Sequence, residues 1–159
     1  MNLKVISGVS LVSSIERCGG FDSAAVYKIT ADWENSDVKE GGSLKILVEY
    51  PICGITNVWL PNSAPMLGVP RFVKPDWNGR HPFCNIARSA PLLSFYDNAD
   101  ENRFTLALSE TQKNVVINYG VNERSTLLCI SFEIELSQYA QSKTAQIYLY
   151  ANTQSIPME

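Results

Sequence analysis

The chain has 159 residues, of which 45% are hydrophobic and 18% are charged, and its formal net charge is −3. This length fits one domain with a full core, and this composition excludes a disordered chain. The near balance of 13 basic and 16 acidic residues, without a basic patch interleaved with aromatics, excludes a typical nucleic-acid-binding protein.

The first third of the chain predicts strands separated by polar loops. A weak alternation from Leu3 to Val9 predicts a first strand, and Cys18-Gly19-Gly20 is predicted as a break. From about Asp22 to Trp33 the apolar and aromatic residues share one face, which predicts a longer strand. The same pattern predicts a further strand from Leu44 to Tyr50.

The segment from Pro51 to Pro91 differs from its surroundings because it holds most of the prolines. Proline fixes φ and removes a backbone donor, so a regular strand here is expected to be interrupted repeatedly. The segment also contains Trp59, Trp77 and the sole histidine, His81. Long irregular segments of this kind are often functional. An equally weighted alternative is that the prolines stiffen a crossover between sheets while the tryptophans fill its underside.

Beyond Pro91 the pattern of apolar and polar residues predicts an up-and-down run of strands. They are expected at Leu92–Tyr96, Arg103–Ser109, Asn114–Tyr119 and Ser125–Leu136, with a final strand from about Lys143 to Ala151. The alternation is clearest from Leu128 to Leu136, and there Cys129 falls on the polar face. The breaks carry Asn, Asp and Gly, which tolerate the backbone angles of a chain reversal.

These elements predict an all-β fold, in which residues 1–159 form a single antiparallel β-sandwich. Little helix is expected beyond a short turn near Ser137 to Gln141. The chain ends soon after its last strand, so we expect a domain boundary there. No apolar run reaches membrane-spanning length and no signal peptide is evident. No membrane partner is therefore expected, and the compartment stays open between the cytoplasm and the periplasm or exterior.

Few residues predict chemistry within this chain. Asp97 with Asp100, or Asp100 with Glu101, could serve as a glycosidase acid pair, but a predicted hairpin loop is where acids are ordinarily solvated. His81 has no nucleophile motif beside it and is expected in a solvated loop. The four cysteines form no CxxC pair, so no zinc site is expected. Their even number permits disulfides, but their spacing does not require them. We therefore predict no catalytic residue, no metal and no cofactor.

A series of segments in the later part of the chain occurs in a recognisable order: Val58-Trp59-Leu60-Pro61, Arg71, Lys74-Pro75-Asp76-Trp77, Ser89-Ala90-Pro91-Leu92-Leu93, Asn102-Arg103-Phe104-Thr105-Leu106-Ala107-Leu108-Ser109, Tyr119-Gly120-Val121-Asn122-Glu123 and Ala145-Gln146-Ile147-Tyr148-Leu149-Tyr150-Ala151-Asn152. Together they resemble the N-terminal domain of glycoside hydrolase family 36, which contains α-galactosidases. Ser109-Glu110 and Glu123-Arg124 depart from the family's pattern, so the sugar stays open.

The resemblance implies a large, supersandwich-like β-sandwich that precedes a catalytic (β/α) barrel, whose two carboxylates hydrolyse terminal α-galactosides with retention. This chain would then be a non-catalytic accessory domain that packs on the C-terminal barrel and helps wall the sugar site. The Trp-x-Pro match assigns a substrate-binding role to Trp59, with Trp77, Asp76 and Arg80 as further candidates, because an indole face stacks well on a sugar ring. Its partners would be a galactoside-type carbohydrate and the barrel. Association into a homo-oligomer is neither predicted nor excluded.

Two other classes of function are kept beside this one. A free-standing carbohydrate-binding β-sandwich would show a planar aromatic platform and would bind sugar on its own. An adhesive sandwich of immunoglobulin type would need a Cys–Trp–Cys core spacing, which Cys53 and Cys129 around Trp59 or Trp77 fit badly.

Overall fold

The computed structural model describes residues 1–7, 11–20, 24–33, 42–51, 57–59, 71–72, 79–83, 92–96, 103–109, 115–122, 124, 126–139 and 141–153, and for 57–59, 71–72, 79–83 and 103 it describes the backbone alone. Within these residues the chain forms strands and one short 3-10 helix: β1 Asn2–Ser7, β2 Val12–Gly20, β3 Ala24–Asp32, β4 Ser43–Pro51, β5 Asn57–Trp59, β6 Arg71–Phe72, β7 Gly79–Phe83, β8 Leu92–Tyr96, β9 Arg103–Leu108, β10 Val115–Val121, β11 Leu127–Glu135, η1 Leu136–Tyr139 and β12 Thr144–Asn152. The predicted all-β fold and the short helical turn near residue 137 are confirmed.

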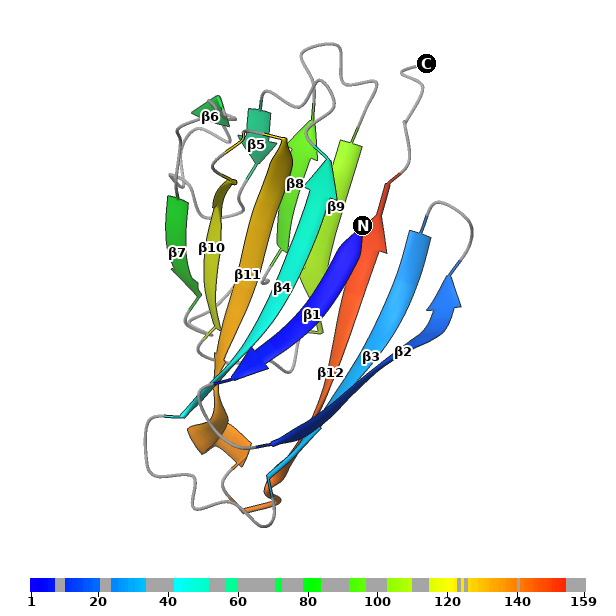
Figure 1. The fold of residues 1–159 in the computed structure, drawn as a ribbon, viewed down its shortest axis with the longest axis vertical. Coiled ribbons are helices and arrows are strands. Elements are labelled where there is room, and N and C mark those ends of the chain that lie inside the picture. The colour runs from blue at the N-terminus through cyan, green and yellow to red at the C-terminus, as the bar shows by residue number, and fades with distance from the viewer. Residues whose placement is uncertain are drawn as a thin grey trace.

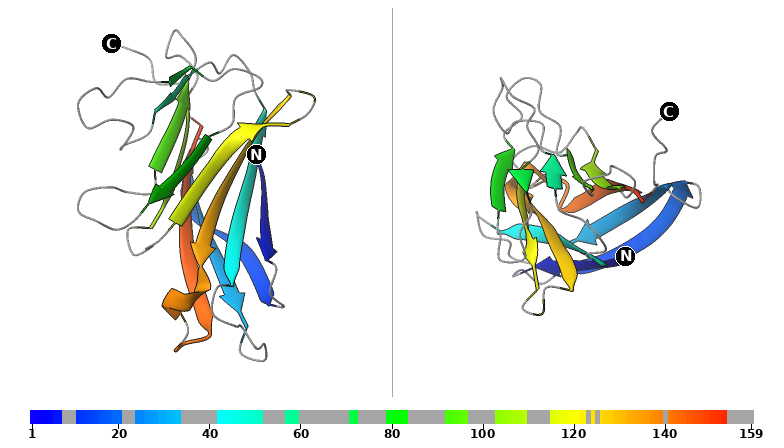
Figure 2. Two further views of the ribbon diagram at one scale, coloured as in Figure 1. Left: turned by 90° about the vertical axis from the view of Figure 1, so that its left-hand side faces the viewer. Right: turned by 90° about the horizontal axis from the view of Figure 1, so that it is seen from above.

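The strands form two antiparallel sheets that pack face to face (Figures 1 and 2). The five-stranded sheet has the order β1-β4-β11-β10-β7, and the seven-stranded sheet has the order β2-β3-β12-β9-β8-β5-β6. Strands β6 and β7 therefore end the two sheets on one lateral edge of the sandwich, with β5 next to β6, while β1 and β2 end them on the other. None of the described helices is long and apolar enough to cross a membrane.

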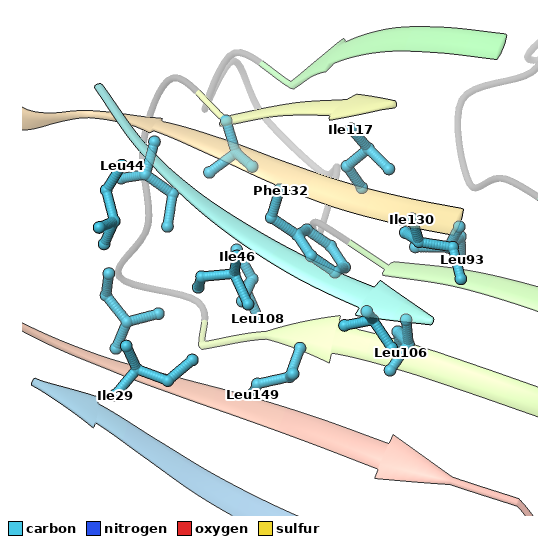
Figure 3. Close-up of a cluster of buried hydrophobic side chains, with 14 of the residues drawn as sticks. Ile29, Leu44, Ile46, Leu93, Leu106, Leu108, Ile117, Ile130, Phe132 and Leu149 are labelled. Carbon is cyan, nitrogen blue, oxygen red and sulfur yellow. The ribbon is translucent and has the colours of Figure 1, made fainter. Parts of the chain in front are cut away.

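The core lies between the two sheets and follows from period-two alternation. In β11, Leu128, Ile130, Phe132 and Ile134 are buried, and the residues between them are half-buried. The seven-stranded sheet contributes the facing layer, which includes Ile29, Leu106 and Leu149 (Figure 3). Across the gap, the ring of Tyr50 on β4 stacks on Phe104 of β9 at a centroid distance of 4.0 Å.

One end of the sandwich is closed by η1, which leads from β11 into β12. Leu136 donates its backbone N–H to the carbonyl of Gly42, and Trp33 donates to the carbonyl of Lys143. The rings of Trp33 and Tyr139 meet edge to face at 6.3 Å. These contacts join the end of the seven-stranded sheet to the connection that leaves the five-stranded sheet.

Three sequence expectations are wrong in detail. Cys18-Gly19-Gly20 is no break but the end of β2, where the register shifts between Arg17 and Gly19 as in a β-bulge. Strands β9 and β10 are consecutive but belong to different sheets, so the up-and-down run is split between two layers. His81 lies within β7 and not in a loop. That strand tolerates Pro82 because it is the last of its sheet.

Candidate functional site

Trp59, the main predicted sugar-binding residue, is the last residue of β5. The backbone register places it opposite Ser94 of β8. Ser94 is half-buried and lies between the buried Leu93 and Phe95, so it belongs to the face of the sheet that points away from the core. Opposite positions in an antiparallel pair share a face, so the Trp59 position belongs to the outer face of the seven-stranded sheet.

Arg80, another predicted site residue, lies in β7 opposite Asn118 of β10. Asn118 is half-buried and alternates with the buried Ile117 and Tyr119. Its side-chain amide donates to the hydroxyl of Ser131 at 3.5 Å, on the outer side of the five-stranded sheet. The Arg80 position therefore belongs to the outer face of that sheet.

The fold brings Trp59 and Arg80 to one lateral edge but not to one face. Strand β5, next to the end strand β6, and strand β7, the end strand of the other sheet, lie on the same side of the sandwich (Figures 1 and 2). The two register positions belong to outer faces that point in opposite directions. A ligand could touch both only by wrapping around this edge, or within a cavity made together with a second body. Trp77 and Asp76 lie outside the described residues, as do the acids of the rejected pairs, Asp97, Asp100 and Glu101.

A second group of aromatic residues was missed by the sequence reasoning. The outer positions of β12 include Tyr148 and Tyr150, and Tyr150 is 45% exposed. Tyr96 lies on the same face at the end of β8. Between them runs a polar row in which Asn152 is opposite Thr105, and Thr105 is opposite Ser94. We call these residues the tyrosine face: Tyr96, Tyr148, Tyr150, Ser94, Thr105 and Asn152. The signal that could have identified them is the alternation of the last strand, in which Ile147 and Leu149 are buried and the tyrosines lie on the other face.

The outer face of the five-stranded sheet has a different character, because it carries charges. Lys45 and Glu133 form an ion pair at 3.8 Å. Glu49, which accepts a hydrogen bond from the amide of Asn2 at 3.0 Å, lies opposite Cys129. Burial, and secondarily the negative charge of Glu49, raises the pKa of the Cys129 thiol. Cys129 is thus on the polar face, as predicted. Among the described residues, no cluster of three potential metal ligands occurs.

Asn122, in the Gly-Val-Asn-Glu segment that contributes to the family resemblance, has a structural role. The side-chain oxygen of Asn122 accepts hydrogen bonds from the backbone N–H groups of Thr126 and Leu127, at 2.8 and 2.9 Å. Its own N–H donates to the Leu127 carbonyl. Asn122 therefore holds the turn between β10 and β11, and this role requires no ligand.

Comparison with known proteins assigns no family. No protein-family profile matches the chain, and no curated protein matches it. The structure is similar to the crystal structure of the Slr1438 protein from Synechocystis sp. PCC 6803, with a TM-score of 0.47 and 12% sequence identity over 97% of this chain. The match spans 61% of the length of that protein's chain. Similarity at this level supports no inference about function.

Proposed function

We propose that this chain is the non-catalytic β-sandwich domain of a glycosidase that resembles α-galactosidases, and that it packs on the catalytic barrel and helps wall the sugar site. One observation supports the proposal: β5, which carries Trp59 and lies next to the end strand β6 of one sheet, and β7, which carries Arg80 and ends the other sheet, lie at the same lateral edge. The two residues are far apart along the chain and are brought to this edge only by the fold.

The division of Trp59 and Arg80 between two outer faces favours an accessory role over a self-contained pocket. A second body that covers the edge would contact both positions, although they belong to opposite outer faces. In the proposed enzyme that body is the barrel, whose two carboxylates perform the displacement. The tryptophan would contribute a large flat contact to the sugar with little loss of rotamer entropy. Its contribution would be to substrate binding and not to bond breaking.

The test is the kinetics of the enzyme encoded by the reading frame that contains this chain. For hydrolysis of an aryl α-galactoside, we expect Trp59→Ala to raise KM about tenfold and to change kcat less than about twofold, because the lost contact is made equally in the ground and transition states. Trp59→Phe should retain most of the affinity, since it keeps an aromatic face.

Ile15→Ala is the matched control, because it removes an exposed large side chain from β2, at the other end of the seven-stranded sheet from β5, and it should leave both constants unchanged. Unchanged kinetics for Trp59→Ala, after correction for the folded fraction, would contradict the proposed role. A reading frame without a segment of alternating strand and helix patterns would contradict the accessory-domain assignment itself.

A further inference from the structure

Exposed apolar side chains gather at the lateral edge where β1 and β2 end the two sheets (Figures 1 and 2). The exposed large hydrophobic residues of the described part of the chain are Met1, Ile6, Val12, Ile15 and Tyr150. All but Tyr150 lie in β1, directly before it, or in β2. Apolar residues that are exposed together on one side of a protein mark an interaction surface.

Strand β2 is exposed on both of its faces, including the face that continues the core. Ile15 lies opposite the fully buried Ile29 of β3, so Ile15 belongs to the core-facing side of the seven-stranded sheet. It is nevertheless 39% exposed, and Ser13 and Arg17, on the same side of β2, are exposed as well. The five-stranded sheet therefore does not cover β2, and the core-facing side of this strand is accessible to a second molecule.

Among the four strands that end the two sheets, β2 is the one whose edge is best suited to pair with another strand. Natural edge strands are kept from pairing by shortness, by proline or by lysine. Strand β6 has two residues, β7 contains Pro82 and β1 contains Lys4. Strand β2 has nine residues without proline or lysine, and its bulge begins only after Arg17. No described strand lies beyond β2, so alternate backbone N–H and C=O groups point away from the sheet.

The sequence of β2 complements itself in one antiparallel register. A two-fold axis at Ile15 sets this residue opposite Ile15 of the second copy, Ser14 opposite Glu16, and Ser13 opposite Arg17. Opposite positions in such a pair share a face, so the two isoleucines form an apolar contact on the core-facing side. Each charged side chain lies opposite a hydroxyl, which can both donate and accept a hydrogen bond. The register therefore contains no pair of like charges.

The two neighbouring registers lack this match. An axis at Glu16 would set the two glutamates directly opposite each other, and like charges in that position are destabilising. An axis at Ser14 would set Val12 opposite Glu16 and Ile15 opposite Ser13, so that no apolar side chain meets another. The distribution of side chains along β2 thus selects Ile15 as the centre.

We infer that β2 is a dimerisation strand, which pairs with β2 of a second copy in the antiparallel register centred on Ile15. The two seven-stranded sheets then form one continuous sheet, and their core-facing sides lie on the same side of it. Such an interface is isologous and closes after two copies. The inference does not depend on the proposed accessory function, because β2 lies at the other end of the sheet from β5.

The length of the strand sets the strength of the dimer. The residues from Val12 to Cys18 span roughly 23 Å at the rise of a β-strand, and one strand pair of this length makes a small interface. We therefore expect a dissociation constant of about 1–100 μM. At the nanomolar protein concentrations of a kinetic assay the protein is then monomeric, so Ile15→Ala remains a neutral control for Trp59→Ala.

Sedimentation velocity of the purified protein over a range of concentrations tests for the dimer. Ile15→Lys sets two lysines opposite each other at the axis, and we expect it to weaken dimerisation by at least about tenfold. Ile15→Val keeps an apolar branched side chain and should dimerise like the parent protein. Ile6→Lys is the matched control, because it makes the same change at an exposed isoleucine of β1, and it should leave the dimer intact. Thermal melts establish that each variant is folded.

Disulfide cross-linking tests the register. In a Cys18→Ser background, which removes the exposed native thiol, oxidation of Ile15→Cys should give a covalent dimer above the yield of the background, because the two new thiols are opposite each other. Ser13→Cys is the control, since the two copies of this position are roughly 13 Å apart along the strands, and it should give none.

Three results would overturn the inference. The first is a protein that stays monomeric up to millimolar concentration. The second is a dimer that Ile6→Lys weakens as much as Ile15→Lys does, since β1 would then form the interface. The third is a covalent dimer formed as readily by Ser13→Cys as by Ile15→Cys, which would exclude the register centred on Ile15.

Discussion

At the scale of single residues, the end of β2 depends on the backbone conformation of Gly20. Its φ of 108° is a conformation that residues with a side chain rarely adopt. A Cβ built at this position would lie 2.0 Å from the carbonyl oxygen of Ala24 and 2.6 Å from the Cα of Ala25. Both neighbours are backbone atoms and cannot move aside without disturbing the pairing of β2 with β3.

We therefore expect Gly20→Ala to lower the free energy of unfolding by about 2 kcal/mol. Gly19→Ala is a close control, because a Cβ there would meet Val26 at an ordinary 3.9 Å. It should change stability by less than about 0.5 kcal/mol. Urea denaturation of the two variants measures both values. Equal losses of unfolding free energy in the two variants would show that the backbone conformation of Gly20 has no special role in stability.

Also at this scale, the environment of Cys129 predicts a slowly reacting thiol. The thiolate is the reactive form, and burial together with Glu49 raises the pKa of Cys129. Alkylation by iodoacetamide at pH 8, followed by peptide mapping, should therefore label exposed Cys18 before Cys129. Glu49→Gln should speed the labelling of Cys129 only modestly, because burial is the larger cause.

The same shift has a defined sign for stability. Folding favours the neutral thiol of Cys129, so its contribution is complete below the pKa of the unfolded thiol and is lost as the pH rises through the higher folded value. Labelling of Cys129 as fast as Cys18 in the folded protein would contradict this account.

At the scale of elements, the β10–β11 hairpin depends on the side chain of Asn122. Its oxygen accepts two backbone hydrogen bonds, and its amide donates to the Thr126 hydroxyl at 3.0 Å. Asn122→Ala removes all three, and we expect it to lower the free energy of unfolding by about 1–2 kcal/mol. Asn122→Asp keeps the acceptor, so its loss should be less than half as large. A chemical-denaturation series that ranks the two variants in the opposite order would exclude the oxygen as the cause.

What the sequence predicts at this scale depends on whether a strand has one dry face. Strand β11 has one buried face, and the alternation of apolar and polar residues from Leu128 to Ile134 predicted it. Strand β2 is exposed along its whole length, because it ends the wider sheet beyond the last strand of the narrower one (Figure 1). No residue of β2 had to be apolar for burial, so no period-two pattern formed and the strand was missed.

The candidate site was predictable in part for a related reason. Residue type marked Trp59 and Arg80 as unusual, but their relative placement depends on pairing with β8 and β10, which come later in the chain. Spacing along the sequence contains no information on which sheet each strand joins. For Tyr148 and Tyr150, the alternation of β12 indicates the outer face, but only the register with β3 shows that Lys28 lies opposite Tyr148.

At the scale of the whole molecule, the two sheets are held together by apolar burial and by aromatic contacts that cross the gap. Tyr50 and Phe104 stack with an interplanar angle of 9°, and Phe95 meets Tyr119 edge to face at 6.2 Å. Each pair joins a strand of one sheet to a strand of the other. The contact between the layers is therefore specific as well as hydrophobic, and it fixes how one sheet lies over the other.

A double-mutant cycle on Tyr50 and Phe104 tests whether the stacking of their rings contributes to the free energy of unfolding. Phe104→Leu keeps most of the buried apolar area, so the cycle with Tyr50→Leu isolates the stacking contribution, which we expect to be about 1 kcal/mol. Tyr139 lies at η1, where Leu136 bonds to the residue that precedes β4, whereas Tyr50 is at the far end of β4. Tyr139→Leu combined with Phe104→Leu should therefore be additive within about 0.5 kcal/mol. If the stability losses of the Tyr50 and Phe104 variants instead add as the losses of the Tyr139 and Phe104 variants do, burial alone holds the layers together. In that case the shapes of the aliphatic side chains would have to fix how one sheet lies over the other.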